Sequence, residues 1–172
     1  MPQFNRGLTI QRVPLPGGDA GTRMTLEHMR RYAIDGSRTI EVRRAAIQAL
    51  DRFGTPAHNP RAAIHAVYRF IQDRIRFVPD PVGTQAIQSP RATLSFGAGN
   101  CAQRATLLAA MLMAIGIPAR LQFRVIGANP SQPHLFSHVY VVAGGIPLDP
   151  TYPNNPVGFE YPNPSRVGDF DL

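Results

Sequence analysis

The stretch from residue 97 to residue 118 constrains the fold of this chain most. It contains a strongly apolar run at helical spacing, and a helix that is apolar over most of its surface has to be buried. A glycine-rich turn precedes the run, and Gly116 followed by Pro118 ends it. We therefore predict a buried helix over residues 101–115, which begins at Cys101, the only cysteine among the 172 residues.

The position of Cys101 at the start of this helix suits a nucleophile. The first backbone N–H groups of a helix have no partner within it, and together with the positive end of the helix dipole they stabilise a thiolate. The same N–H groups can bind the oxyanion that develops on an attacked carbonyl. The alternative interpretation is a small buried core cysteine without a chemical role.

Two downstream residues favour the chemical interpretation. His138 opens an apolar run, and Asp149 follows 11 residues later, at the end of the next strand pattern. A cysteine, a histidine base and an acidic residue that orients the histidine, in this order and at the ends of elements, predict a catalytic triad. In such a site the thiolate attacks an amide carbonyl, the histidine protonates the leaving amine, and a thioester remains.

Helical patterns fill the first part of the chain and strand patterns fill the last part. Besides the central helix, helices are predicted over residues 25–36, capped by Thr25, over residues 39–53, and from Pro60 onward. A short extended segment and a long loop follow, over residues 75–78 and 79–98. Strands are predicted over residues 119–127, 137–143 and 146–149. This order predicts an α+β fold, with the N-terminal helices and the nucleophile helix packed on a small antiparallel sheet.

One domain is expected, because 172 residues of which 44% are hydrophobic can form one core. Residues 1–24 and 152–172 are rich in proline and have little periodicity, so we predict two extended arms around a domain over residues 25–151. Arms of this kind either wrap their own domain or order against neighbouring proteins. Both alternatives stay open.

The net charge of +7 lies in the first half of the chain. Residues 1–76 hold 13 arginines against 6 acidic residues, residues 77–172 hold 5 against 5, and there is no lysine. Arginine suits contacts with carboxylates and phosphates. Neither a nucleic-acid motif nor interleaved aromatic residues accompany the charge, so we interpret these arginines as solvated side chains on amphipathic helices and expect no nucleic-acid partner.

The composition also argues against several kinds of site. A single cysteine excludes an internal disulfide and a multi-thiolate metal site. His134 and His138 have no glutamate nearby, so we expect no metal and no cofactor. No apolar run is long enough to span a membrane, and the N-terminal residues lack the pattern of a signal peptide. We expect a reducing location, either the cytoplasm or a virion assembled there.

Four segments, in this order, resemble the core of the transglutaminase-like superfamily. They are Gly99-Asn100-Cys101 with the apolar helix after it, Gly116-Ile117-Pro118-Ala119-Arg120, Ser137-His138-Val139-Tyr140-Val141 and Leu148-Asp149-Pro150-Thr151. The resemblance spans about residues 60–151. It implies a papain-like α+β fold in which Cys101 is the nucleophile, His138 the general base and acid, and Asp149 the residue that orients His138.

The resemblance extends upstream of the central helix. Thr25-Leu26-Glu27-His28-Met29 and residues 76–81 resemble a branch common in phage and prophage genomes.

The resemblance gives no direct match for the oxyanion hole. Animal transglutaminases place a tryptophan there, and this chain has none. Gln85, Gln88 and Gln103 are therefore the candidates for a substitute donor.

The resemblance is compatible with two kinds of function, an enzyme and an assembly protein. The family includes acyl transferases that join glutamine to amines and microbial peptidases or amidases, and without the extra domains of animal transglutaminases we favour hydrolysis. We expect a phage- or prophage-associated cysteine peptidase or amidase acting on a protein or peptide, peptidoglycan peptides included. The alternative is a virion or tail-assembly protein that keeps the fold with idle or secondary catalysis and binds neighbouring virion proteins through both arms.

Overall fold

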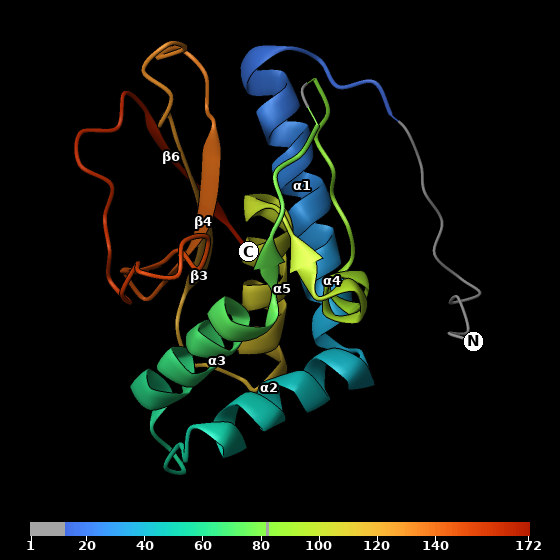
Figure 1. Ribbon diagram of the computed structural model, residues 1–172, viewed down its shortest axis with the longest axis vertical. Helices are drawn as coiled ribbons and strands as arrows, with labels where there is room; N and C mark the ends of the chain where they lie inside the picture. The colour runs from blue at the N-terminus through green and yellow to red at the C-terminus, as the bar shows by residue number, and fades with distance from the viewer. Residues whose placement is uncertain (1–12, 82) are drawn as a thin grey trace.

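The computed structural model describes residues 13–81 and 83–172, which form a helical layer packed against an antiparallel sheet (Figure 1). The helices in this part of the chain are α1 (Gly18–Ser37), α2 (Ile40–Arg52), α3 (Pro60–Arg74), α4 (Pro90–Phe96) and α5 (Cys101–Ala114). The strands are β1 (Arg76–Phe77), β2 (Ala98–Gly99), β3 (Leu121–Ile126), β4 (His138–Ala143), β5 (Ile146–Leu148) and β6 (Val167–Asp171). The predicted α+β class is confirmed.

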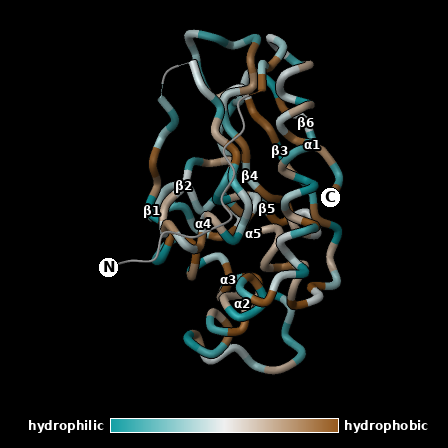
Figure 2. The backbone as a smooth tube through the Cα atoms, turned by 90° about the vertical axis from the view of Figure 1, so that its right-hand side faces the viewer, coloured by the Kyte–Doolittle hydropathy of each residue, from teal (hydrophilic) through white to brown (hydrophobic). Residues whose placement is uncertain are grey.

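Helix α5 forms the centre of the core. It lies between α1 and the sheet and also contacts α2 and α3 (Figure 1). Its large apolar side chains are fully buried, among them Leu107, Leu108, Met111 and Leu112. Figure 2 shows hydrophobic segments gathered around α5 and the neighbouring strands, while the outer helices are mixed. A helix enclosed in this way can reach solvent chiefly at its ends, and its first residue is Cys101.

The antiparallel sheet has the strand order β5-β4-β3-β6. A tight turn at Gly144-Gly145 joins β4 to β5, where both glycines have positive φ values that other residues rarely adopt. Strand β4 is buried on both faces from Val139 onward. One face packs on the helical core, and the other carries Tyr140, against which Tyr161 of the C-terminal segment packs.

The predicted N-terminal arm is partly helical in the structure. The extended conformation predicted through residue 24 is wrong for residues 18–24, because α1 begins at Gly18 rather than at Thr25. Asp19 in its first turn suits the positive end of the helix dipole and pairs with Arg166 at 2.8 Å. Residues 1–12 of the N-terminal arm lie outside the described residues.

The C-terminal segment is also more regular than predicted, since it ends in β6. This strand pairs antiparallel with β3, and Arg124 of β3 binds the carboxylate of Asp169 at 2.7 Å. Helix α4 and strand β2 likewise replace part of the loop predicted over residues 79–98. The Ser89 hydroxyl caps α4 by accepting from the Ala92 N–H, and Pro90 fits its first turn.

None of the helices in the described part of the chain has both the length and the apolarity that crossing a membrane requires.

Candidate active site

A reciprocal capping box places Cys101 at the first turn of α5. The Asn100 side-chain oxygen accepts from the Gln103 N–H at 2.8 Å, and the Gln103 side-chain oxygen accepts from the Asn100 N–H at 3.0 Å. The Asn100 amide also donates to Asp80 at 2.7 Å and to the carbonyl of Ala86 at 2.9 Å. These bonds use Asn100 fully and leave the N–H groups of the first two helical residues without a partner inside the helix.

His138 and Asp149 meet because the β4–β5 hairpin brings its two ends together. His138 is the first residue of β4, and Asp149 follows β5 directly. The His138 Nε2 lies 2.9 Å from Oδ2 of Asp149, whose side chain is fully buried. The other carboxylate oxygen accepts from the backbone N–H of Thr151 at 3.0 Å. With Nε2 engaged in this way, Nδ1 is the ring nitrogen left for a second partner.

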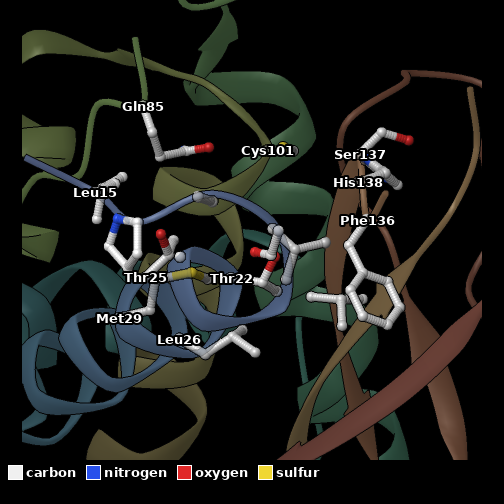
Figure 3. A pocket seen from close by; sticks show the side chains of 16 residues that line it. Leu15, Thr22, Thr25, Leu26, Met29, Gln85, Cys101, Phe136, Ser137 and His138 are labelled. Carbon is white, nitrogen blue, oxygen red and sulfur yellow. The ribbon is translucent and has the colours of Figure 1, made fainter. Parts of the chain in front are cut away.

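Cys101 and His138 both line one cavity of about 220 Å³ (Figure 3), so Cys101 is the predicted nucleophile on the side of the ring away from Asp149. Burial alone would lower the pKa of His138, but the hydrogen bond with Asp149, followed by the interaction with Cys101, raises it to about 9. Burial would also raise the pKa of Asp149, and the hydrogen bonds from His138, Thr151 and Tyr161 lower it instead. Both effects favour an imidazolium next to a carboxylate at neutral pH.

The three glutamines considered as oxyanion donors are placed differently. Gln103 is nearly buried, and its side chain is engaged by Asn100 and by the carbonyl of Ala86. Gln88 donates its amide to the carbonyl of Ala98 at 3.1 Å. Gln85 lines the cavity with Cys101, its side chain extends from the loop toward the side on which Cys101 lies (Figure 3), and its amide donates to Asp80 at 3.4 Å.

Tyr161 joins the His138–Asp149 pair, and the sequence analysis missed it. Its hydroxyl donates to Oδ2 of Asp149 at 2.6 Å and lies 3.1 Å from Nε2 of His138. Its ring meets the imidazole edge-on, with centroids 5.1 Å apart. Burial and then the hydrogen bond to Asp149 raise the pKa of Tyr161, so the hydroxyl stays a donor. No local signal in the proline-rich segment around it points to this role.

Two buried residues hold the turn that follows Asp149. The Tyr68 hydroxyl lies 2.7 Å from the carbonyl oxygens of both Asp149 and Asn155. The Arg104 guanidinium, nearly buried in α5, donates to the carbonyl of Thr151 at 2.9 Å. Burial lowers the pKa of Arg104, and the nearby Asp149 opposes this effect. A lone charged residue inside the apolar run is the sequence signal that points to Arg104.

Within residues 13–81 and 83–172, His, Cys, Asp and Glu side chains form no group of three or more that can hold a metal ion.

A family model described as the transglutaminase-like superfamily matches residues 47–150, which is more than half of the chain. The chain belongs to the transglutaminase-like superfamily. The match contains Cys101, His138 and Asp149, whereas α1 and Tyr161 of this transglutaminase-like protein lie outside it. The phage and prophage branch stays a prediction. A comparison with curated protein sequences finds no match.

Two solved structures are similar to the chain. A candidate protease from Parabacteroides distasonis is 16% identical, with a TM-score of 0.52, over 78% of this chain and 29% of that one. A candidate cysteine protease from Cytophaga hutchinsonii is 22% identical, with a TM-score of 0.48, over 74% of this chain and 42% of that one. The chain thus spans less than half the length of either protein, and at this identity the first likeness shows the fold alone.

We expect the free energy of unfolding to fall as the pH rises through about 9. The pKa of His138 is raised from 6.5 to about 9 in the folded protein, so its contribution is complete below about 6.5 and is lost as the proton leaves. Urea unfolding between about pH 6 and 10 measures this loss. His138→Gln should flatten the slope, and an equal slope in both proteins would contradict the assignment.

We expect Tyr161→Phe to lower the free energy of unfolding at acidic pH. The Tyr161 hydrogen bond helps to lower the pKa of Asp149, whose contribution to stability is present above 3.8 and is lost as the pH falls through the folded-state value. Without the hydroxyl this loss should begin at a higher pH, as measured by unfolding between about pH 2 and 5. Tyr140→Phe is the matched control, because the Tyr140 hydroxyl donates to Glu160 instead. The same shift in both variants would argue against the role.

Proposed function

We propose that this transglutaminase-like domain is a cysteine hydrolase that cleaves an amide bond of a protein or peptide. Cys101 is the nucleophile, His138 the general base and acid, and Asp149 the residue that orients His138. The observation that carries the proposal is the buried His138–Asp149 contact at 2.9 Å, whose histidine lines one cavity with Cys101. A nucleophile beside a histidine base that a carboxylate orients is the arrangement that cysteine acyl chemistry requires.

The course of the reaction follows from the protonated state of the His138 imidazole. The Cys101 sulfur forms a bond to the carbonyl carbon, the carbon–nitrogen bond breaks, and the His138 imidazolium gives its proton to the departing amine. A thioester on Cys101 and a neutral imidazole remain. Water then attacks the thioester carbonyl and gives a proton to His138, and the sulfur leaves as a thiolate. The carboxylic acid product departs, and the starting state is restored.

The oxyanion of each tetrahedral intermediate needs donors near the sulfur. The backbone N–H of Cys101 lies at the start of α5, where no carbonyl of the helix can accept from it. Of the three glutamines considered, Gln85 is the one that lines the cavity with Cys101. We assign the oxyanion hole to the Cys101 N–H and to the second amide hydrogen of Gln85, whose first donates to Asp80 at 3.4 Å, while Gln103 and Gln88 act as structural residues through their backbone hydrogen bonds.

The virion or tail-assembly alternative finds less support among the described residues. Its basis was a pair of free arms, but the C-terminal one packs on its own domain through β6 and contacts the candidate site through Tyr161. Virion partners, a phage origin and the cytoplasmic or virion location stay predictions. The description of the Parabacteroides distasonis protein as a candidate protease agrees with hydrolysis.

Substitutions at the triad test the proposal. Cys101→Ser should abolish hydrolysis of p-nitrophenyl acetate and of peptide substrates while changing the free energy of unfolding by less than about 1 kcal/mol, because the side chains are nearly the same size. Asp149→Asn should lower kcat by roughly 10²–10⁴-fold, since the orienting charge is lost. The matched control is Asp171→Asn, whose carboxylate pairs with Arg120 at the exposed edge of the sheet.

Reaction with iodoacetamide gives a second readout that needs no substrate. His138→Gln should slow the alkylation of Cys101 at neutral pH, because the imidazolium that stabilises the thiolate is gone. Two results together would show that Cys101 is a structural core residue and that the proposal is wrong. Alkylation would be equally fast in wild type and His138→Gln, and Cys101→Ser would lower the free energy of unfolding while hydrolysis persists.

A further inference from the structure

The cavity beside Cys101 has one wall that lies outside the family core. Helix α1 and the segment before it supply this wall, whereas the family match begins at residue 47. The opposite wall comes from the sheet and the loop before β4, with Phe136 and Val139 among its residues. In Figure 3 the side chains of Thr22, Thr25 and Leu26 on α1 and that of Phe136 across the gap lie around the same space.

The chemistry of the lining is neutral. Apart from Cys101 and His138, none of the described residues around the cavity carries a titratable side chain. The apolar members include Leu26, Met29 and Phe136, and the polar ones are uncharged hydroxyl or amide groups. The one positive charge in the lining is the His138 imidazolium, and Asp149 already neutralises it. A charged group that entered this space would therefore lose hydration without gaining an unpaired opposite charge, which costs free energy. An apolar group would instead gain from leaving water.

The size of the cavity fits one side chain rather than a whole ligand. Its volume is about 220 Å³, whereas pockets that enclose drug-sized ligands measure roughly 300–1,000 Å³. The cavity includes the nucleophile, and the acyl part of a substrate stays bonded to Cys101 through both half-reactions. A side chain on the acyl side therefore remains next to this cavity longer than any group on the departing amine.

The α1 wall is held in place by contacts at its first turns. The Asp19 carboxylate pairs with Arg166 at 2.8 and 2.9 Å, which ties α1 to the segment that enters β6. The chain before α1 crosses close over the helix, because a Cβ on Gly21 would overlap the carbonyl oxygen of Pro16. Residues 15–16 thereby close one end of the cavity, so its shape exists before a substrate arrives.

We propose that this cavity is a specificity subsite for an uncharged, apolar side chain, carried by one of the two acyl-side residues nearest the cleaved bond. This inference rests on the proposed hydrolase function and names its substrate class. Peptides with a leucine-sized side chain there react at least about tenfold faster than peptides with glutamate or lysine, since apolar pockets discriminate by roughly 10–200-fold per group.

Peptidyl vinyl sulfones test the inference on the full chain. The Cys101 thiolate adds to the vinyl carbon and the adjacent carbon takes a proton, so intact mass reports the rate of labelling. Leucine, glycine, glutamate and lysine are placed in turn at the last and at the second-last residue, with alanine at the other position. Leucine should be preferred at one of these positions.

Filling the cavity should remove the preference. Thr25→Phe projects a ring from α1 into the space and should slow the leucine probe at least about tenfold more than it slows the smaller iodoacetamide. Arg23→Phe is the matched control, because Arg23 is exposed on the same helix and does not line this cavity. If Thr25→Phe does not fold, Phe136→Ala enlarges the cavity from the opposite wall and should lower the preference for leucine over glycine.

The outcomes separate this inference from the function on which it rests. Labelling of Cys101 that depends on His138 but is equal for all four side chains at both positions would overturn the subsite and leave the hydrolase proposal intact. An unchanged leucine preference in both Thr25→Phe and Phe136→Ala would also overturn it. If no probe labels Cys101, and His138→Gln reacts with iodoacetamide like wild type, the proposed function fails and the subsite fails with it.

Discussion

The burial of α5 is the constraint on which the rest of the structure depends. Its apolar residues contact the outer helices on one side and the sheet on the other, so neither layer has a complete core without it. The capping box of Asn100 and Gln103 satisfies the N–H groups of these two residues, and it leaves those of Cys101 and Ala102 without a partner inside the helix. The same geometry exposes the first helical residue, Cys101, at the junction of the two layers.

The electrostatics of the site follow from that junction. Asp149 is buried under the β4–β5 hairpin, where an isolated carboxylate would be costly, and donors from His138, Thr151 and Tyr161 stabilise its ionised form. The raised pKa of His138 is the counterpart of this arrangement, because the imidazolium is the charge that the buried carboxylate favours. A proton is thus held where the leaving amine of an acyl-transfer reaction needs one.

The sequence predicted the elements whose signals are local. The apolar run predicted α5, the alternation of apolar and polar residues predicted β3, and the apolar run after His138 with the Gly144-Gly145 turn predicted β4 and β5. The order of Cys101, His138 and Asp149 along the chain predicted a triad, and the structure places His138 beside Asp149 and in one cavity with Cys101. Helix α4 was missed although Ser89 and Pro90 carry a local start signal, because the prolines and glycines around them indicated a loop. The start of α1 was placed too late, since Gly17 caps it without a side chain.

Other parts of the site depend on contacts that no local pattern encodes. Tyr161 reaches Asp149 because the C-terminal segment folds back over the sheet before β6 pairs with β3. Gln85 lines the cavity because Asp80 accepts from the Asn100 amide, from the backbone N–H of Ala86 and from the Gln85 amide itself, and so fixes the loop. The choice among three glutamines therefore required the tertiary structure, as did the contribution of α1 to the cavity.

The protonation state of His138 at neutral pH tests the central claim most directly. Side-chain ¹⁵N NMR reports whether each ring nitrogen carries a proton, and comparison with His138→Gln identifies the signal among the five histidines. The account predicts an imidazolium with both nitrogens protonated at pH 7, and a return toward the ordinary pKa of about 6.5 in Asp149→Asn. A neutral His138 ring at pH 7 in the wild-type protein, unchanged by Asp149→Asn, would contradict it.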